Sequence, residues 1–181
     1  MSNDAATPPT PTQAAPTPAA RAALRWSDAA AAAAIVVADQ VTKAIVLREL
    51  PLHDSVTVIP GLLNFTYVQN TGAAFGMLNS ADFPGKTLVL TALALLALVA
   101  IGIYAIRFAG ETRLARVGIT LIFAGAIGNL IDRARLGFVV DFVDAYWSGW
   151  HFWAFNVADA AITVGAIALL LDVVVGARDA S

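Results

Sequence analysis

The chain has 181 residues, of which 59% are hydrophobic and 13% charged, and its formal net charge is −2. With a mean hydropathy of +0.73, this composition is too apolar for a soluble domain and indicates a polytopic membrane protein. The 11 basic residues are scattered rather than clustered, so we expect no binding to nucleic acid. Without cysteine and with only two histidines, the chain lacks a thiol nucleophile and a His/Cys ligand set, so we expect no metal and no cofactor.

The N-terminal segment, residues 1–24, is rich in alanine, proline and threonine and has no apolar periodicity. Such a segment cannot bury a core, which predicts a disordered tail. We expect the folded unit to comprise residues 25–178, with the tail on the cytoplasmic side of the membrane.

Four apolar segments are long enough to cross a bilayer as helices, at residues 29–47, 87–106, 114–134 and 153–175. The predicted fold class is therefore an all-α membrane protein with four transmembrane helices. Four spans place both termini on the same side of the membrane. When Lys43 and Arg133 within the spans are left out, six basic residues lie on that side and three on the other, which favours the cytoplasm for both termini.

Polar residues interrupt three of the four spans, always in the half that would face the outer leaflet. Asp39 and Lys43, four residues apart on the first span, predict an intrahelical ion pair. For Asp132 a local interpretation is open, in which it pairs with Arg133 or caps a helix. Small residues on the third span would let a neighbouring helix approach closely. The other polar residues are Asn129, Asn156 and Asp159. The small residues on the third span are Ala124, Gly125 and Gly128.

The two outer connections differ in character. Residues 48–83 contain alternating apolar residues around a Pro-Gly turn, which predicts a small extracytoplasmic β-sheet, or cradle, on the membrane surface. The connection between the third and fourth spans carries three of the four tryptophans, a composition typical of an interfacial belt. We expect residues 55–76 and 138–153 to cover the polar cluster. His151 would then be interfacial, and Asp144 would lie in an exposed loop.

Asp141 and Asp159 are the strongest candidates for chemistry. Neither has a basic residue three or four positions away, and Asp141 lies in the apolar stretch "FVVDFV". Two carboxylates held close together share a proton, and such a pair can activate a water molecule without serine, cysteine or metal. For Asn70 the sequence leaves two interpretations open, a turn residue or a contact with substrate.

Five short motifs follow one another along the spans and their connections: "DQVTK" (39–43), "NFTYVQNTGAAFG" (64–76), "GNLIDR" (128–133), "VVDF" (139–142) and "FNVAD" (155–159). In this order they resemble the lipoprotein signal peptidase family, also called signal peptidase II. That family comprises membrane aspartic peptidases that cut prolipoproteins before a diacylglyceryl-modified cysteine. The resemblance covers nearly all of the chain beyond the N-terminal tail.

The resemblance implies a site and a setting. It implies prolipoprotein substrates, contact with membrane lipids and inhibition by globomycin-type compounds. It also implies a multi-pass protein of the bacterial cytoplasmic (inner) membrane, with the active site near the outer leaflet; we expect a monomer. The catalytic dyad would be Asp141 and Asp159. The supporting residues would be Asp39, Lys43, Asn70, Asn129, Asp132, Arg133 and Asn156.

Two other classes of function compete with this interpretation. A small proton- or ion-coupled transporter also carries charged residues within its spans, but it should line a path through both leaflets. Here the second span has no charge and the polar residues lie on one side only. A non-catalytic membrane scaffold would give no reason for two unpaired carboxylates beneath an aromatic cover.

Overall fold

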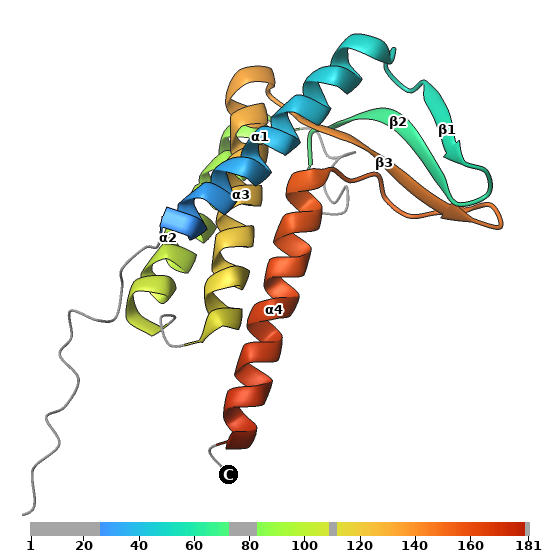
Figure 1. The fold of residues 1–181 in the computed structure, drawn as a ribbon. Coiled ribbons are helices and arrows are strands. Elements are labelled where there is room, and N and C mark those ends of the chain that lie inside the picture. The colour runs from blue at the N-terminus through green and yellow to red at the C-terminus, as the bar shows by residue number, and fades with distance from the viewer. Residues whose placement is uncertain (1–25, 73–82, 109–111, 180–181) are drawn as a thin grey trace, which may run out of the picture.

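The computed structural model describes residues 26–72, 83–108 and 112–179. In chain order, the elements are α1 (Trp26–Glu49), β1 (Ser55–Ile59), β2 (Leu63–Asn70), α2 (Lys86–Phe108), α3 (Arg113–Leu136), β3 (Val139–Trp147), β4 (Trp150–His151) and α4 (Val157–Asp179) (Figure 1). Four helices with a small antiparallel sheet confirm the predicted fold class. The tail at residues 1–24 and part of the 48–83 segment lie outside the described residues.

All four helices are long and apolar enough to cross a membrane. The helices α1, α2 and α3 contain the first three predicted spans and extend beyond them by one to three residues at each end. The fourth span was placed wrongly at its start, because α4 begins at Val157 rather than at residue 153. Just before it, Phe155 forms an isolated β-bridge with Val143, to whose carbonyl its backbone N–H donates.

A reciprocal cap fixes the start of α4. The side-chain oxygen of Asn156 accepts a hydrogen bond from the backbone N–H of Asp159 at 2.9 Å. In return, the backbone N–H of Asn156 donates to the Asp159 carboxylate at 3.3 Å. Each partner satisfies a backbone or side-chain group that the helix end would leave exposed. A polar pair within the predicted span therefore begins the helix.

The sheet has four strands in the order β1-β2-β3-β4, all antiparallel. Its central pair joins β2 to β3, with Leu63 opposite Ala145 at one end and Asn70 opposite Val139 at the other. The sequence interpretation confined the sheet to residues 48–83 and treated β3 and β4 as an aromatic connection, which was wrong. The stretch "VVDFVDAYW" is mostly buried on both faces, so it lacks the alternating pattern that identifies a half-exposed strand.

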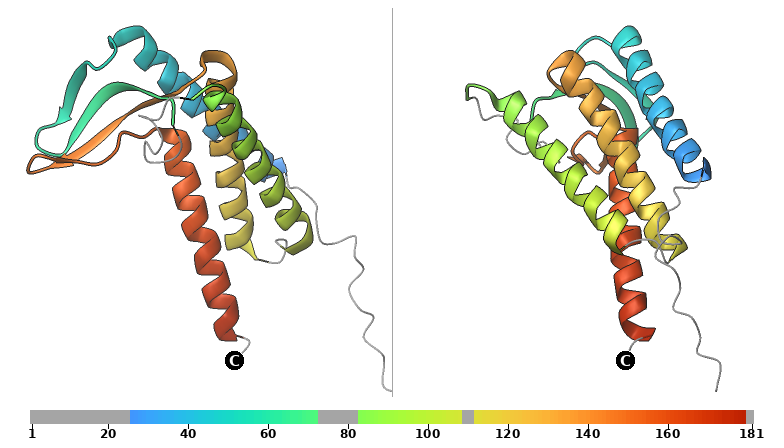
Figure 2. Two further views of the ribbon diagram at one scale, coloured as in Figure 1. Left: turned by 180° about the vertical axis from the view of Figure 1, so that it is seen from behind. Right: turned by 90° about the vertical axis from the view of Figure 1, so that its left-hand side faces the viewer.

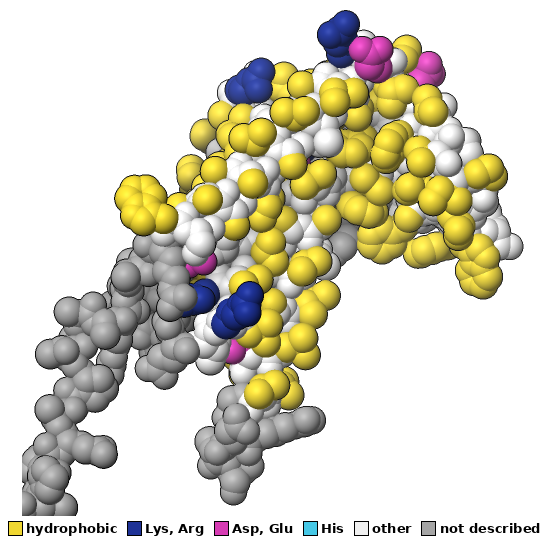
Figure 3. Space-filling view, viewed as in Figure 1, with side chains coloured by type: hydrophobic (Ala, Val, Ile, Leu, Met, Phe, Trp, Pro, Cys, Tyr) yellow, Lys and Arg dark blue, Asp and Glu magenta, His cyan; other side chains and the backbone are white. Residues whose placement is uncertain are grey.

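The sheet projects sideways from one end of the helix bundle (Figure 1). The C-terminal ends of α1 and α3 and the first turn of α4 meet at this end, which we call the sheet end (Figure 2). In the space-filling view, apolar side chains cover the visible helices and continue onto the sheet (Figure 3). Charged side chains gather near the two ends of the helices, as expected for a bundle whose middle lies in hydrocarbon.

Glycines bring α3 and α4 into close contact. A Cβ added at Gly118 would lie 2.8 Å from the carbonyl oxygen of Gly165, and one added at Gly125 would overlap the carbonyl oxygen of Ala158. A Cβ at Gly128 would lie 2.5 Å from the Asp39 carboxylate on α1. The expectation that small residues on the third span admit a neighbouring helix is confirmed.

Gly125→Ala should weaken the bundle. The added methyl group would meet the backbone of α4, which cannot move aside without separating the helices, so we expect a loss of about 1–3 kcal/mol in the free energy of unfolding. Thermal unfolding in detergent would measure it. Gly102→Ala is a matched control, because the nearest atom to its Cβ is the ring end of Phe123 at 3.3 Å. A Gly125→Ala protein as stable as Gly102→Ala would contradict the close contact.

Candidate active site

Five elements contribute polar side chains to one cluster at the sheet end. The helix α1 provides Asp39 and Lys43, and β2 ends in Asn70. Asn129, Asp132 and Arg133 come from the last turns of α3, Asp141 from β3, and Asn156 and Asp159 from the start of α4. All nine residues singled out in the sequence therefore lie in elements that converge here.

Lys43 is the centre of a buried ionic network. Its ammonium group lies 2.9 Å from Asp39 and 2.9 Å from Asp132, and its exposed fraction is only 2%. It also donates to the side-chain oxygen of Asn129 at 3.0 Å. The predicted Asp39–Lys43 ion pair is confirmed. Since a lone buried charge is very unfavourable, the two carboxylates and the ammonium group depend on one another.

Asp39 and Asp132 extend this network to the backbone. Asp39 accepts from the backbone N–H of Ala158 at 2.9 Å, in the first turn of α4. Asp132 accepts from the backbone N–H of Val140 at 3.1 Å, beside Asp141 on β3. The local interpretation of Asp132, pairing with Arg133 or helix capping, was wrong, because its carboxylate forms an ion pair with Lys43 and accepts from the backbone of β3. These contacts fix the two segments that carry the candidate dyad, which are β3 and the first turn of α4.

Asp141 is held by two amides. Its carboxylate accepts from Asn156 at 2.7 Å and from Asn70 at 2.9 Å, and the residue is 2% exposed. Asn70 also accepts from the backbone N–H of Gly72 at 2.9 Å. Its side chain therefore takes part in a turn while its amide group contacts Asp141. A contact of Asn70 with substrate stays a prediction.

Asp159 is linked to Asp141 through asparagine side chains. Asn129 donates to Asp159 at 2.8 Å, while its own oxygen accepts from Lys43 and from Asn156. Asn156 thus contacts Asp141 through its side-chain amide and Asp159 through its backbone N–H. One continuous hydrogen-bonded chain through Asn129 and Asn156 therefore joins the two carboxylates, and Lys43 joins it at Asn129.

Electrostatics favour a shared proton on this pair. Burial raises the pKa of Asp141, the charge of Asp159 raises it further, and the outcome is a pKa of about 7. Hydrogen bonds from Asn70 and Asn156 and the charge of Lys43 oppose this rise. A carboxyl group with such a pKa can be protonated at neutral pH while its neighbour is ionised, which is the condition for paired acid and base chemistry.

The pH profile should reflect this proton. We expect kcat/KM to fall as pH rises through about 7, where Asp141 loses the proton. Asn70 favours the ionised form by donating to it, so Asn70→Ala should raise the pKa and move this limb to higher pH. Gln69→Ala is the control, because Gln69 donates to the hydroxyl of Tyr67 instead. A limb that stays in place in Asn70→Ala would contradict the contact.

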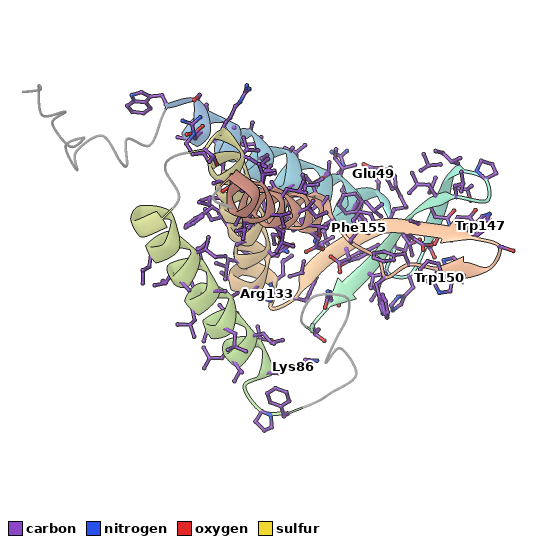
Figure 4. All side chains as sticks on the ribbon, turned by 90° about the horizontal axis from the view of Figure 1, so that it is seen from below. Glu49, Lys86, Arg133, Trp147, Trp150 and Phe155 are labelled. Carbon is purple, nitrogen blue, oxygen red and sulfur yellow. The ribbon has the colours of Figure 1, made fainter. Side chains whose placement is uncertain are left out.

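Two basic residues lie beside the cluster. Arg133 donates to the carbonyl oxygen of Gly72 at 3.0 Å, and its charge acts on Asp159, Asp141 and Asp132. Lys86, at the start of α2, donates to the hydroxyl of Thr71 at 3.1 Å. Figure 4 labels Arg133 near the end of α3 and Lys86 at the start of α2. These two contacts tie the residues that follow β2 to α3 and α2.

Sequence reasoning missed Gln40 and placed Asp144 wrongly. Gln40 donates to Asp132 at 3.0 Å and to the carbonyl of Gly128 at 3.2 Å, so it joins α1 to α3 beside the network. The only sequence signal for Gln40 was its position directly after Asp39 in the motif "DQVTK". Asp144 was expected in an exposed loop, yet it lies buried on β3 and pairs with His151 at 2.8 Å. Within residues 26–72, 83–108 and 112–179, no group of three or more His, Cys, Asp or Glu side chains could hold a metal ion.

Fold and site together define a polytopic membrane protein in which a buried aspartate, Asp141, and a half-buried one, Asp159, are linked through asparagines at one end of the spans. Residues 31–175 match the family model described as signal peptidase (SPase) II. The chain is 48% identical to the lipoprotein signal peptidase of Geobacter metallireducens over 139 residues, which cover 77% of this chain and 85% of that protein. It is 46% identical to that of Geobacter sulfurreducens over 142 residues, covering 77% and 86%.

Solved structures agree with these relatives. A bacterial membrane enzyme determined at 2.3 Å matches with a TM-score of 0.78 and 35% identity, over 87% of this chain and 93% of that one. A second, determined at 1.9 Å, matches with a TM-score of 0.75 and 34% identity, over 83% and 94%. The chain belongs to the signal peptidase II family. It is a multi-pass bacterial membrane protein and a peptide hydrolase.

Proposed function

We propose that this protein removes the signal peptide from prolipoproteins by cleaving before the diacylglyceryl-modified cysteine, with Asp141 and Asp159 as an aspartic dyad. The observation that carries the catalytic assignment is the asparagine bridge. The side-chain amide of Asn156 donates to Asp141, while its backbone N–H donates to Asp159. Membership of the signal peptidase II family and the names of the relatives support the substrate.

The dyad would act on the scissile peptide bond with one shared proton. The ionised carboxylate takes a proton from water as the water oxygen bonds to the carbonyl carbon, and the protonated carboxyl group donates its proton to the carbonyl oxygen. The resulting diol collapses as the C–N bond breaks and the dyad returns a proton to the leaving amine. The products are a signal peptide with a new carboxyl group and a lipoprotein with a free N-terminal cysteine.

The surrounding residues would support this chemistry in two ways. Asn70 and Asn156 orient Asp141, and Asn129 orients Asp159, through the hydrogen bonds described above. The network of Asp39, Lys43 and Asp132 holds the elements on which these residues lie. Arg133 is placed to act on substrate or on the chain beside Gly72, to whose carbonyl it donates.

The membrane position of the dyad follows from the same proposal. We place the sheet end at the outer leaflet and both termini in the cytoplasm, with residues 25–178 as the peptidase unit and residues 1–24 as a tail. An apolar signal peptide then stays in the bilayer while its scissile bond reaches the dyad at the outer surface. The charged network lies at this one end, which favours a peptidase over the transporter alternative, since a transporter needs a path through both leaflets.

Cleavage of a defined substrate tests the proposal. Detergent-purified protein would be incubated with a diacylglyceryl-modified prolipoprotein and, separately, with the same prolipoprotein lacking the lipid. We expect the modified substrate to yield a signal peptide whose mass ends at the residue before the cysteine. Absence of cleavage, or equal cleavage of both substrates at another bond, would overturn the proposed function.

The response to inhibitors should be that of an enzyme with an aspartic dyad. We expect activity to resist EDTA and serine- or thiol-directed reagents, because the proposed reaction uses neither a metal nor a covalent nucleophile. A globomycin-type compound should block cleavage. Loss of activity in EDTA that zinc restores would contradict the mechanism.

A further inference from the structure

A second polar cluster lies on the sheet and has no part in the proposed mechanism. The carboxylate of Asp144 is buried, with the residue 9% exposed. Its two oxygens lie 2.8 Å and 3.0 Å from Nδ1 of His151, and Asn64 donates to it at 3.3 Å. The His151 ring stacks on Tyr146, with centroids 5.0 Å apart. The Tyr146 hydroxyl accepts from the backbone N–H of Gly61 in the β1–β2 turn, at 2.9 Å.

This cluster lies on the two segments of the chain that lead to the dyad, which are β3 and the segment from β4 to α4. Asp144 follows Asp141 on β3, three residues along. His151 precedes Asn156 by five residues on the segment that returns from β4 to α4. In Figure 4, Trp147 and Trp150 mark the far end of this ribbon and Phe155 lies near the bundle. The Asp144–His151 pair therefore lies between the tip of the ribbon and the dyad.

Besides this pair, backbone hydrogen bonds hold the return segment to β3: the carbonyl of Phe155 accepts from Phe142 and Val143 at 3.0 Å and 2.8 Å, and its N–H donates to Val143 at 3.1 Å. Strand β4 comprises only Trp150 and His151, and farther along a single isolated bridge joins Phe155 to Val143. Between them, the backbone N–H of Phe152 donates to Ala145 at 2.8 Å. Backbone bonds alone specify the register of so short a segment weakly, and a slip by one residue turns every side chain to the other face. Such a slip would displace Asn156 and Asp159 relative to Asp141.

We propose that the Asp144–His151 pair is a positioning clasp that fixes the return segment against β3 and thereby aligns Asn156 and Asp159 with Asp141. This inference rests on the proposed function of the dyad. A neutral imidazole donating from Nδ1 and an imidazolium can both bind the carboxylate, so the clasp holds in either protonation state of His151. Stacking on Tyr146 keeps the ring in the plane that this contact needs.

The identity of the side chain at position 151 separates a clasp from simple packing. His151→Asn keeps a donor near the place of Nδ1, whereas His151→Gln carries its amide near the place of Nε2 and cannot reach Asp144 in the same way. His151→Ala and Asp144→Ala remove the contact from either side. Trp147→Phe, on the exposed tip of the same ribbon, is the matched control.

Cleavage kinetics of the full-length protein with the diacylglyceryl-modified prolipoprotein would test the clasp. We expect His151→Ala and Asp144→Ala each to lower kcat about 10- to 100-fold, because a displacement of about 1 Å at a catalytic group has effects of this size. KM should stay near wild type, and the thermal midpoint should fall less in Asp144→Ala than in His151→Ala, which leaves the buried Asp144 carboxylate without its ring partner. The double variant should be no slower than either single variant, and His151→Asn should recover more kcat than His151→Gln.

Wild-type kcat in both alanine variants would overturn the clasp while leaving the proposed function in place. Equal kcat in His151→Asn and His151→Gln would also overturn it, and this comparison decides even where the alanine variants fold poorly. A wild-type protein that does not cleave the modified prolipoprotein would overturn the proposed function and the clasp together.

Discussion

Asp141→Asn and Asp159→Asn should each abolish cleavage of a lipid-modified prolipoprotein, with turnover reduced by about 10³-fold or more, because general acid–base catalysis contributes about 10²–10⁴-fold. An amide keeps the size of the carboxyl group but cannot share or transfer the proton. Cleavage by purified variants, followed by mass spectrometry of the products, would measure the loss. Asp54→Asn is the matched control, since Asp54 is exposed on the connection before β1.

The fold should survive these two changes. Because the pKa of Asp141 is raised to about 7 in the folded protein, its ionised form destabilises the fold above that pH. Asp141→Asn removes this charge, so the thermal midpoint above pH 7 should be unchanged or higher. Near-wild-type turnover in either variant would remove that residue from the dyad. Loss of activity together with a large fall in the thermal midpoint would indicate a structural role instead.

Lys43→Met should destabilise the protein more than any other single change considered. Methionine fills a similar volume but leaves Asp39 and Asp132 as uncompensated buried carboxylates, and breaking a buried ion pair in this way costs about 3–5 kcal/mol. The thermal midpoint in detergent should fall strongly. Asp132→Asn should lower both the thermal midpoint and activity, because it loses charge pairing with Lys43 and a contact to the backbone of Val140.

Arg48→Gln is the control for this second prediction. Arg48 pairs with Glu49 at 3.1 Å, but its side chain is 85% exposed, and ion pairs in water contribute little. Its thermal midpoint should stay near wild type. If Lys43→Met were as stable as Arg48→Gln, the ionic network could not be what holds α1 to α3 and α4.

Much of the architecture could be predicted because it depends on local properties of the sequence. The length of an apolar run decides whether a helix can span a bilayer, and the four helices follow that rule closely. Charges inside such helices are unfavourable enough to need partners, so Asp39, Lys43 and Asp132 stood out. The Asp39–Lys43 pair was predictable because helical geometry alone brings residues four apart together.

Features that depend on distant partners could not be predicted. Asp132 pairs with Lys43 across 89 positions of sequence, and nothing near Asp132 indicates this. Strand β3 is buried on both faces and therefore lacks strand periodicity, so its pairing with β2 was missed. The start of α4 was placed too early because the aromatic residues before Asn156 are apolar enough to extend the run, although they pair with β3.

Direct titration of the Asp141 carboxyl group would test whether the two aspartates form one proton-sharing pair. Protein labelled with ¹³C at the aspartate carboxyl carbon would be followed by NMR against pH, with Asp141→Asn identifying the Asp141 signal. We predict a midpoint near the pKa of about 7 in the wild-type protein and a lower midpoint in Asp159→Asn, where the neighbouring charge is gone. The same midpoint in both proteins would contradict the dyad.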